Sequence, residues 1–257
     1  MTPDETRARL LYRDGLMLVI DKPAGVPVHR GPKGGASLED DFEALRFGLP
    51  RNPALAHRLD RETAGCLILG RHHKALEKLG LLFKQGKIKK TYWALVSGNP
   101  QEDEGVIDLP LGRLDDKRGW WMKVDPKGQP ALTRWRALGR GTWRGSPIAW
   151  LEMEPKTGRT HQLRVHAAAQ GWPILGDAAY GAPADLPLQL LARKVVVPLS
   201  QGKPPVEVEA PIPPHMLEPL KACGLAEGRL LPNEASPDQP VGAAKQDDCA
   251  AQQNVKG

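Results

Sequence analysis

The chain has 257 residues and a formal net charge of +6, and 40% of its residues are hydrophobic. A chain of this length can bury a full core as one large domain or two small ones. No apolar run approaches the ~18 residues that a membrane-spanning helix needs. The first residues also lack the basic start and apolar core of a secretion signal, so we expect neither feature.

The first predicted elements lead into an irregular loop. A short apolar run at 16–20 predicts a buried strand, which the turn formers at 22–25 bring to an end. Ser37 and Asp40 have the spacing of a capping box and predict a helix that continues through about Phe47. Glycine and proline residues then favour a loop, which is a usual location for functional side chains.

A helix is predicted at 73–85, where apolar residues recur at helical spacing and Gly86 follows. Between positions 71 and 90 there are seven basic residues and one acidic residue, Glu77, and this difference of six equals the net charge of the whole chain. The seven are Arg71, Lys74, Lys78, Lys84, Lys87, Lys89 and Lys90. A positive field concentrated here indicates an anionic partner. A solvated basic helix face is the simpler alternative.

The remaining pattern is dominated by strands. Short apolar or period-two runs predict strands at 92–96, 120–124, 131–138, 148–154 and 188–197. Several of these follow one another without an intervening helix. This favours an α+β fold (mixed α/β) around a central, largely antiparallel mixed sheet over a doubly wound parallel sheet. From Pro232 onward the chain lacks aromatic, Ile and Leu residues, and we expect a disordered tail at 232–257.

The loop after the predicted first helix contains the candidate catalytic residue, Asp60. It stands in the sequence His-Arg-Leu-Asp-Arg-Glu-Thr-Ala-Gly at 57–65. An Asp with an ordinary pKa of about 4 is ionised at neutral pH and needs no separate base to become a nucleophile. Arg58 and Arg61 flank it in the sequence. A second basic segment at 156–166, which includes Arg164, could supply a forked guanidinium partner for this carboxylate.

Four segments in the same order resemble the RluA family of RNA pseudouridine synthases. The family pattern reads His-Arg-Leu-Asp, two variable residues, Thr, a small residue and Gly, followed later by Gly-Arg-Thr-His-Gln-Leu-Arg-Val-His. Both are present here, at 57–65 and 158–166, together with the family-like segments 21–25 and 90–96. The resemblance implies a catalytic domain at 10–231 with a long central mixed sheet and a central cleft. Residues 1–9 are then an N-terminal extension, and the small RNA-binding domain that many members carry ahead of the catalytic domain is expected to be absent.

The resemblance also implies roles for individual residues. Asp60 matches the indispensable family carboxylate, Arg164 the arginine that pairs with it, and Tyr92 the tyrosine that packs against a flipped base. Arg58 corresponds to the residue associated with displacing that base. The expected substrate-binding residues are Arg58, His57 as the residue that fixes the loop, Leu163 as an apolar pocket wall, Arg61 and Lys90. One departure is Leu191, where many relatives carry His.

No metal or cofactor is predicted. His161 and His166 lie five positions apart and off a common helical face, and the adjacent His72 and His73 have no acidic third ligand nearby. The glycine-rich stretch at 31–35 lacks the spacing of a nucleotide-phosphate loop. Three scattered cysteines predict neither a disulfide framework nor a metal site and fit a reducing cytoplasm; they are Cys66, Cys223 and Cys249.

The resemblance implies an RNA partner, a stem-loop of tRNA or rRNA, with no membrane and no obligate protein partner evident. Two alternatives stay open. The first is an inactive relative that binds RNA through its basic surface. The second is a glycosidase, which would need a second carboxylate such as Glu62 or Asp177 at a fixed distance from Asp60. Release of tritium from uridine C5 separates isomerisation from binding, and free uracil or sugar would indicate a glycosidase.

Overall fold

The computed structural model describes residues 2–31, 34–115, 120–181, 185–200 and 202–226. Within these ranges a ten-stranded sheet has the order β1-β2-β4-β11-β5-β10-β9-β6, with β12 beside β11 and β3 beside β4. Its strands are β1 (Leu10–Arg13), β2 (Met17–Lys22), β3 (Ala54–Leu55), β4 (Ala64–Gly70), β5 (Lys89–Ser97), β6 (Glu104–Asp108), β9 (Leu132–Trp143), β10 (Ser146–Pro155), β11 (Leu190–Val197) and β12 (Val206–Glu209). A separate hairpin is formed by β7 (Leu111–Arg113) and β8 (Met122–Val124). The predicted tail at 232–257 lies outside the described residues.

The sheet is largely antiparallel, as predicted. Among its described strand pairs only β11 and β4 run parallel, with Leu191 opposite Ala64 and Ala192 opposite Gly65. This pair is so close that a side chain at position 65 has no room: a Cβ on Gly65 would lie 2.4 Å from the carbonyl oxygen of Ala192. Gly65 also has φ +106°, a backbone conformation that glycine adopts readily. The glycine that follows the Asp60 loop therefore allows this loop to join the centre of the sheet.

Four α-helices and one 3₁₀ helix are found among the described residues. They are α1 (Pro3–Ala8), the 3₁₀ helix η1 (Leu38–Leu45), α2 (His73–Lys84), α3 (Gln162–Ala169) and α4 (Pro214–Ala222). The helix predicted from Ser37 is present with its capping box, but it is a 3₁₀ helix and ends at Leu45. The sequence did not predict α3, because six of its eight residues are buried and it shows no apolar stripe on one face.

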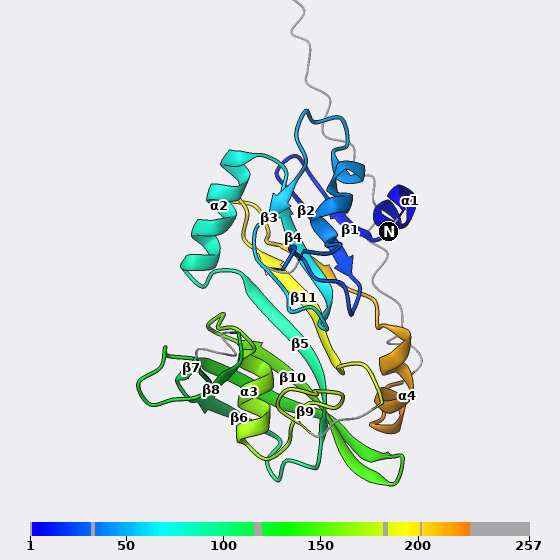
Figure 1. The fold of residues 1–257 in the computed structure, drawn as a ribbon, viewed down its shortest axis with the longest axis vertical. Helices are drawn as coiled ribbons and strands as arrows, with labels where there is room; N and C mark the ends of the chain where they lie inside the picture. Colours follow the sequence, from blue (N-terminus) through cyan, green and yellow to red (C-terminus); the bar gives the residue numbers. More distant parts are fainter. Residues whose placement is uncertain (1, 32–33, 116–119, 182–184, 201, 227–257) are drawn as a thin grey trace, which may run out of the picture.

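The sheet separates three main hydrophobic clusters. One cluster lies under β4, β5, β10 and β11 and is covered by α4. A second cluster packs η1 onto β2 and β4, and a third packs α3 onto β5 and β10. Strands β5 and β11 run through the middle of the molecule and connect its two halves (Figure 1). Tyr92 on β5 packs against both the second and the third cluster, so it marks the place where the two halves meet.

Candidate active site

A pocket of about 790 Å³ lies where the two halves of the molecule meet. It is lined by the loop 56–60 with Thr63, by the end of α2 and the residues that follow it, by Tyr92, and by the segment 154–164. The volume falls in the range of small-molecule sites, which suits one nucleotide. The two segments singled out in the sequence, about a hundred positions apart, thus form opposite walls of one pocket.

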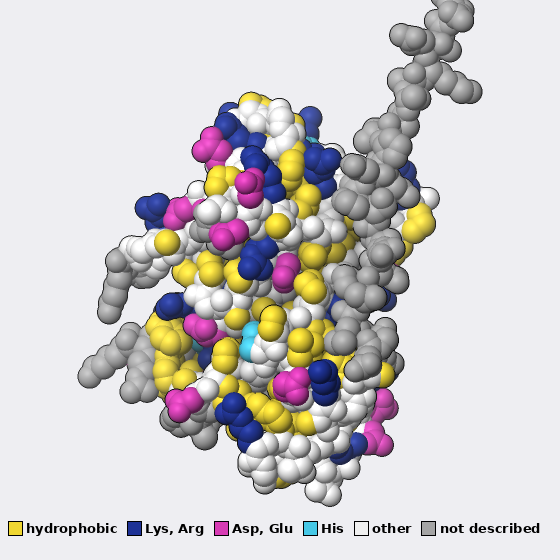
Figure 2. Space-filling view, turned by 90° about the vertical axis from the view of Figure 1, so that its right-hand side faces the viewer, with side chains coloured by type: hydrophobic (Ala, Val, Ile, Leu, Met, Phe, Trp, Pro, Cys, Tyr) yellow, Lys and Arg dark blue, Asp and Glu magenta, His cyan; other side chains and the backbone are white. Residues whose placement is uncertain are grey.

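The pocket wall is strongly basic. Seven Lys and Arg side chains and two carboxylates contribute to its lining. The cations are Arg58, Lys84, Lys89, Lys90, Lys156, Arg159 and Arg164, and the carboxylates are Asp60 and Glu154. Two of these cations are paired locally: Nζ of Lys156 lies 2.5 Å from Oε2 of Glu154, and Nη2 of Arg164 lies 2.7 Å from Oδ1 of Asp177. On the face shown in Figure 2, by contrast, acidic and basic side chains are interspersed. The pocket therefore favours a polyanionic ligand.

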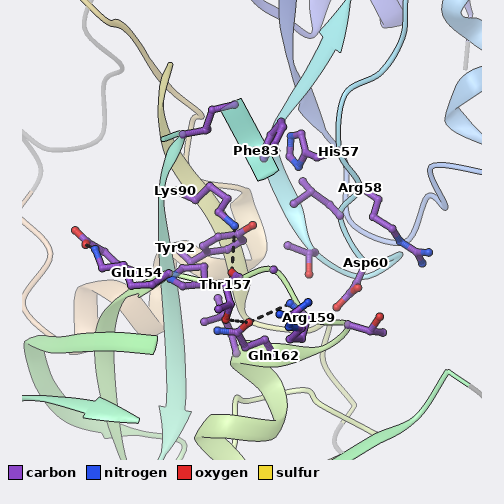
Figure 3. Close-up of a pocket in the computed structure, with 18 of the residues that line it drawn as sticks. His57, Arg58, Asp60, Phe83, Lys90, Tyr92, Glu154, Thr157, Arg159 and Gln162 are labelled. Carbon is purple, nitrogen blue, oxygen red and sulfur yellow. Dashed lines mark hydrogen bonds and ion pairs between the residues drawn. The ribbon is translucent and has the colours of Figure 1, made fainter. Parts of the chain in front are cut away.

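Asp60 lies in this pocket with 20% of its side chain exposed. Its Oδ2 atom is 3.8 Å from Nη1 of Arg164 and 3.9 Å from Nε2 of His161. In Figure 3, Arg58 and Asp60 lie on one side of the pocket, and Lys90, Tyr92 and Thr157 lie on the other. A carboxylate so placed faces a nucleotide-sized space with cationic support behind it.

The forked partner of Arg164 is not Asp60, as the sequence suggested, but Asp177. Arg164 donates from Nε and Nη2 to the two carboxylate oxygens of Asp177, at 2.8 and 2.7 Å. Asp177 also accepts from the backbone N–H groups of Ala179 and Tyr180. Both members of the pair are buried, with side chains 9% and 0% exposed. Asp177 therefore uses two of the three guanidinium nitrogens and leaves Nη1 to face Asp60.

Tyr92 lines the pocket from β5. Burial, and then the negative charge of Asp60, raise the pKa of the Tyr92 phenol above its ordinary value, so this group is neutral at pH 7. Lys90 lies two residues before it on the same strand and donates to the carbonyl oxygen of Thr157 at 3.3 Å. A neutral aromatic ring beside the carboxylate offers a stacking surface for a planar base. Its raised pKa also means that the phenolate, the form that could accept a proton, is scarcely populated at pH 7.

His57 and Leu163 lie where the sequence placed them, and Arg61 does not. His57 accepts a hydrogen bond from the N–H of Ile68 at 2.9 Å through Nε2, which ties the loop to β4. Leu163 is buried in the pocket wall. Arg61 lies outside the pocket lining, because its Nε donates to the carbonyl oxygen of Gly25 at 2.9 Å. Arg58 lines the pocket, and its guanidinium makes no hydrogen bond or ion pair with the described residues.

The structure also identifies a residue whose role the sequence did not reveal. Lys22 is fully buried and donates from Nζ to the carbonyl oxygens of Pro23 and Arg61, both at 2.8 Å. Burial lowers the pKa of Lys22 to about 8. The N–H of Gly25 donates to the same Arg61 carbonyl. The turn at 22–25 therefore holds Arg61, the residue next to Asp60, by its backbone carbonyl oxygen.

We expect Lys22→Met to lower the free energy of unfolding by about 1–3 kcal/mol, because Met has a similar length but cannot donate to the carbonyl oxygens of Pro23 and Arg61, and of these two only the Arg61 oxygen keeps a second donor, the N–H of Gly25. Urea denaturation followed by circular dichroism measures the change. Lys203→Met, at an exposed lysine, is the matched control and should change stability by less than about 0.5 kcal/mol. Equal stability of the two variants would show that Lys22 does not hold the loop.

His57 is expected to make the fold sensitive to acid. Burial, and then the positive charge of Lys90, lower the pKa of His57 to about 3, whereas an unfolded His titrates near 6.5. Between these values the unfolded chain binds the extra proton, so the free energy of unfolding falls as the pH drops from about 6.5 toward 3. In His57→Gln the loss of stability between pH 7 and pH 4.5 should be smaller by about 1–2 kcal/mol. Urea denaturation at the two pH values tests this, and an unchanged pH dependence would contradict it.

Leu191, where many relatives carry His, does not line the pocket. It is fully buried in the cluster beneath β4 and β5, while its neighbour Leu190 lines the pocket wall. The substitution therefore changes core packing on the opposite face of the sheet.

In the described part of the chain, no helix is long and apolar enough to cross a membrane. The same residues contain no group of three or more His, Cys, Asp or Glu side chains that could hold a metal ion.

Comparison with known proteins identifies the class to which this fold and pocket belong. Residues 16–169, more than half of the chain, match the family model described as RNA pseudouridylate synthase. The chain therefore belongs to the RluA family of RNA pseudouridine synthases, which are isomerases. The predicted family, enzyme class and α+β fold are confirmed.

Individual relatives agree with this assignment. An uncharacterized RNA pseudouridine synthase of Zymomonas mobilis is 44% identical over 210 residues, which cover 80% of this chain and 94% of that protein. One from Synechocystis is 34% identical, and the match spans 70% of this chain but 57% of that longer protein. Among solved structures, human RNA pseudouridylate synthase domain containing 4 superposes with a TM-score of 0.72 at 27% identity, covering 86% of this chain and 95% of its own.

Proposed function

We propose that the chain isomerises specific uridines in structured RNA, in a stem-loop of tRNA or rRNA, with Asp60 as the catalytic carboxylate. The observation that carries this proposal is the position of Asp60 in a basic, nucleotide-sized pocket beside Arg164 and Tyr92. The reaction breaks the bond from ribose C1′ to uracil N1, turns the base and forms a bond from C1′ to C5. The C5 proton is lost and N1 gains one, so no electrons are exchanged with a redox partner.

Asp60 is suited to this sequence of steps. A carboxylate can bond to the ribose or the base and later leave, or it can stabilise positive charge on the sugar. The Nη1 group of Arg164 faces this carboxylate with a positive charge at 3.8 Å. Tyr92 gives the detached uracil a flat surface on which it turns without leaving. Leu163 closes the pocket with an apolar wall.

The target nucleotide must leave its stack to reach Asp60, at a cost of a few kcal/mol. We propose that Arg58 takes the place of the extruded base, because its guanidinium has no partner among the described residues and its plane can stack on neighbouring bases. We propose that Lys90 and Lys84, the last residue of α2, contact phosphates beside the target, because both line the pocket. Selection would then depend on the shape of a stem-loop rather than on a long sequence.

The two alternatives explain less of the site. An inactive RNA-binding relative would not need a carboxylate held beside Arg164 and Tyr92. A glycosidase needs a second carboxylate. Asp177 is fully buried in its pair with Arg164, and Glu62 lies outside the pocket lining, 3.5 Å from Arg61. Glu154 lines the pocket, but it is paired with Lys156 at 2.5 Å. We propose a reducing compartment for the protein, because the described cysteines, Cys66 and Cys223, are buried free thiols.

Mapping of pseudouridines by chemical derivatisation tests the proposal. Total RNA is compared from cells that lack the protein and from cells restored with wild type. The expected result is at least one site in tRNA or rRNA that disappears in the deficient cells and returns with wild type. If all sites persist without the protein, and purified protein releases no tritium from C5-labelled RNA, the proposed activity is wrong.

A further inference from the structure

His161 has an unusual backbone conformation beside the catalytic carboxylate. It directly precedes α3 and has φ 53° and ψ 19°, the left-handed region that few residues other than glycine adopt. Its buried ring points Nε2 toward Oδ2 of Asp60, at 3.9 Å. Strained backbone of this kind persists where the surrounding structure enforces it, and it is concentrated at functional sites. The conformation of His161 therefore requires an explanation from its contacts.

Tyr180 fixes the opposite side of the imidazole ring. Its phenol oxygen lies 2.6 Å from Nδ1 of His161 and accepts a hydrogen bond from the N–H of Met122 at 2.9 Å. The backbone N–H of Tyr180 donates to Asp177, the residue that also holds Arg164. The buried carboxylate of Asp177 thus supports both groups that face Asp60. It binds the guanidinium of Arg164 directly and supports the imidazole of His161 through Tyr180.

These contacts decide which nitrogen of His161 carries the proton. Burial lowers the pKa of His161, so the ring is neutral at pH 7 and has a single N–H. The phenol of Tyr180 already accepts from Met122 and has one proton to donate, and Nδ1 lies 2.6 Å away. Nε2 then carries the ring proton and presents it to the Asp60 carboxylate. The other tautomer would turn the lone pair of Nε2 toward a negatively charged oxygen.

We propose that His161 is a positioning residue for Asp60, held by Tyr180 so that its Nε2–H orients the carboxylate toward the substrate. The proposal rests on the proposed function and adds a second donor to the one that Arg164 supplies. Closing the 3.9 Å gap by about 1 Å, as catalytic contacts do when substrate binds, gives a hydrogen bond. Asp60 would then be fixed from two directions and could not rotate away from the nucleotide.

The test uses the full chain and bulk RNA from cells that lack the protein, labelled with tritium at uridine C5. Tritium release is measured over a range of RNA concentrations for His161→Leu, His161→Gln and Tyr180→Phe. We expect His161→Leu to lower the maximal rate about 10- to 100-fold and leave the half-saturating RNA concentration within about threefold. Tyr180→Phe should lower the rate about 10-fold, and His161→Gln, whose amide can donate to Asp60, should recover most of the wild-type rate.

The double variant His161→Leu, Tyr180→Phe provides the decisive comparison. If Tyr180 acts through His161, the double variant is no slower than His161→Leu alone. Additive losses, equal losses in the Gln and Leu variants, or a change confined to RNA affinity would overturn the proposal. Thermal melts identify any variant that fails to fold. If His161→Leu unfolds, near-wild-type activity of His161→Gln together with a slow, folded Tyr180→Phe supports the proposal. A slow His161→Gln together with a Tyr180→Phe that is as fast as wild type overturns it.

The same assay separates this inference from the proposed function. If wild type releases no tritium from any RNA, the proposed function fails. If wild type is active and His161→Leu is folded and equally active, only the role of His161 fails.

Discussion

Asp60→Asn is expected to abolish tritium release from uridine C5, with a loss of about 10⁴-fold or more, because the amide can neither act as a nucleophile nor stabilise positive charge on the sugar. The substitution keeps the size and shape of the side chain. Asp60 is partly exposed, and its contacts to Arg164 and His161 are 3.8 and 3.9 Å long. We therefore expect the free energy of unfolding to change by less than about 1 kcal/mol. Tritium release and urea denaturation measure the two effects separately.

The matched control for this prediction is Glu62→Gln. It makes the same chemical change two residues farther along the same loop, at a carboxylate that lies outside the pocket lining. Wild-type activity in this variant would show that the loss depends on the position of Asp60. Substantial activity in Asp60→Asn together with inactivity in Glu62→Gln would show that the chemistry depends on Glu62 and that our assignment to Asp60 is wrong.

The sequence predicted the two walls of the pocket because each wall is a continuous motif. Asp60 and His57 stand in one segment, Leu163 and Arg164 in the other, and short-range patterns predicted the strand and loop around the first. The antiparallel sheet was also predictable, because strands that follow one another without helices pair most simply in that way. For these features, local sequence and final structure agree.

What the sequence could not reveal depends on contacts between distant segments. Helix α3 is buried on nearly all sides, so it lacks the one-sided apolar pattern that identifies a helix. The fork between Arg164 and Asp177 joins a helix to a loop thirteen positions away, and nothing in the residue types favours Asp177 over Asp60 as the partner. Tyr180 lies next to His161 only after the chain has turned back past α3.

Asp177→Asn is expected to lower the free energy of unfolding by about 3–5 kcal/mol, because it leaves the buried Arg164 cation without its forked counter-ion. The amide oxygen can still accept from the N–H groups of Ala179 and Tyr180, so the change is mainly one of charge. Urea denaturation at pH 7 measures the loss. Arg30→Gln is the control, since it breaks a pair with Asp40 in which the arginine is two-thirds exposed, and it should change stability far less than Asp177→Asn does.

The same substitution should reduce the rate of tritium release by about 10- to 100-fold under conditions where the variant is folded, because Asp177 is what aims Nη1 of Arg164 at Asp60. In the proposed function Arg164 both stabilises the fold and orients Asp60, so we expect its own removal to lower stability and rate together. Asp177→Asn separates them better, since the guanidinium remains. If the folded variant kept the full wild-type rate, Arg164 would be a structural ion pair, and the orientation of Asp60 would depend on other contacts.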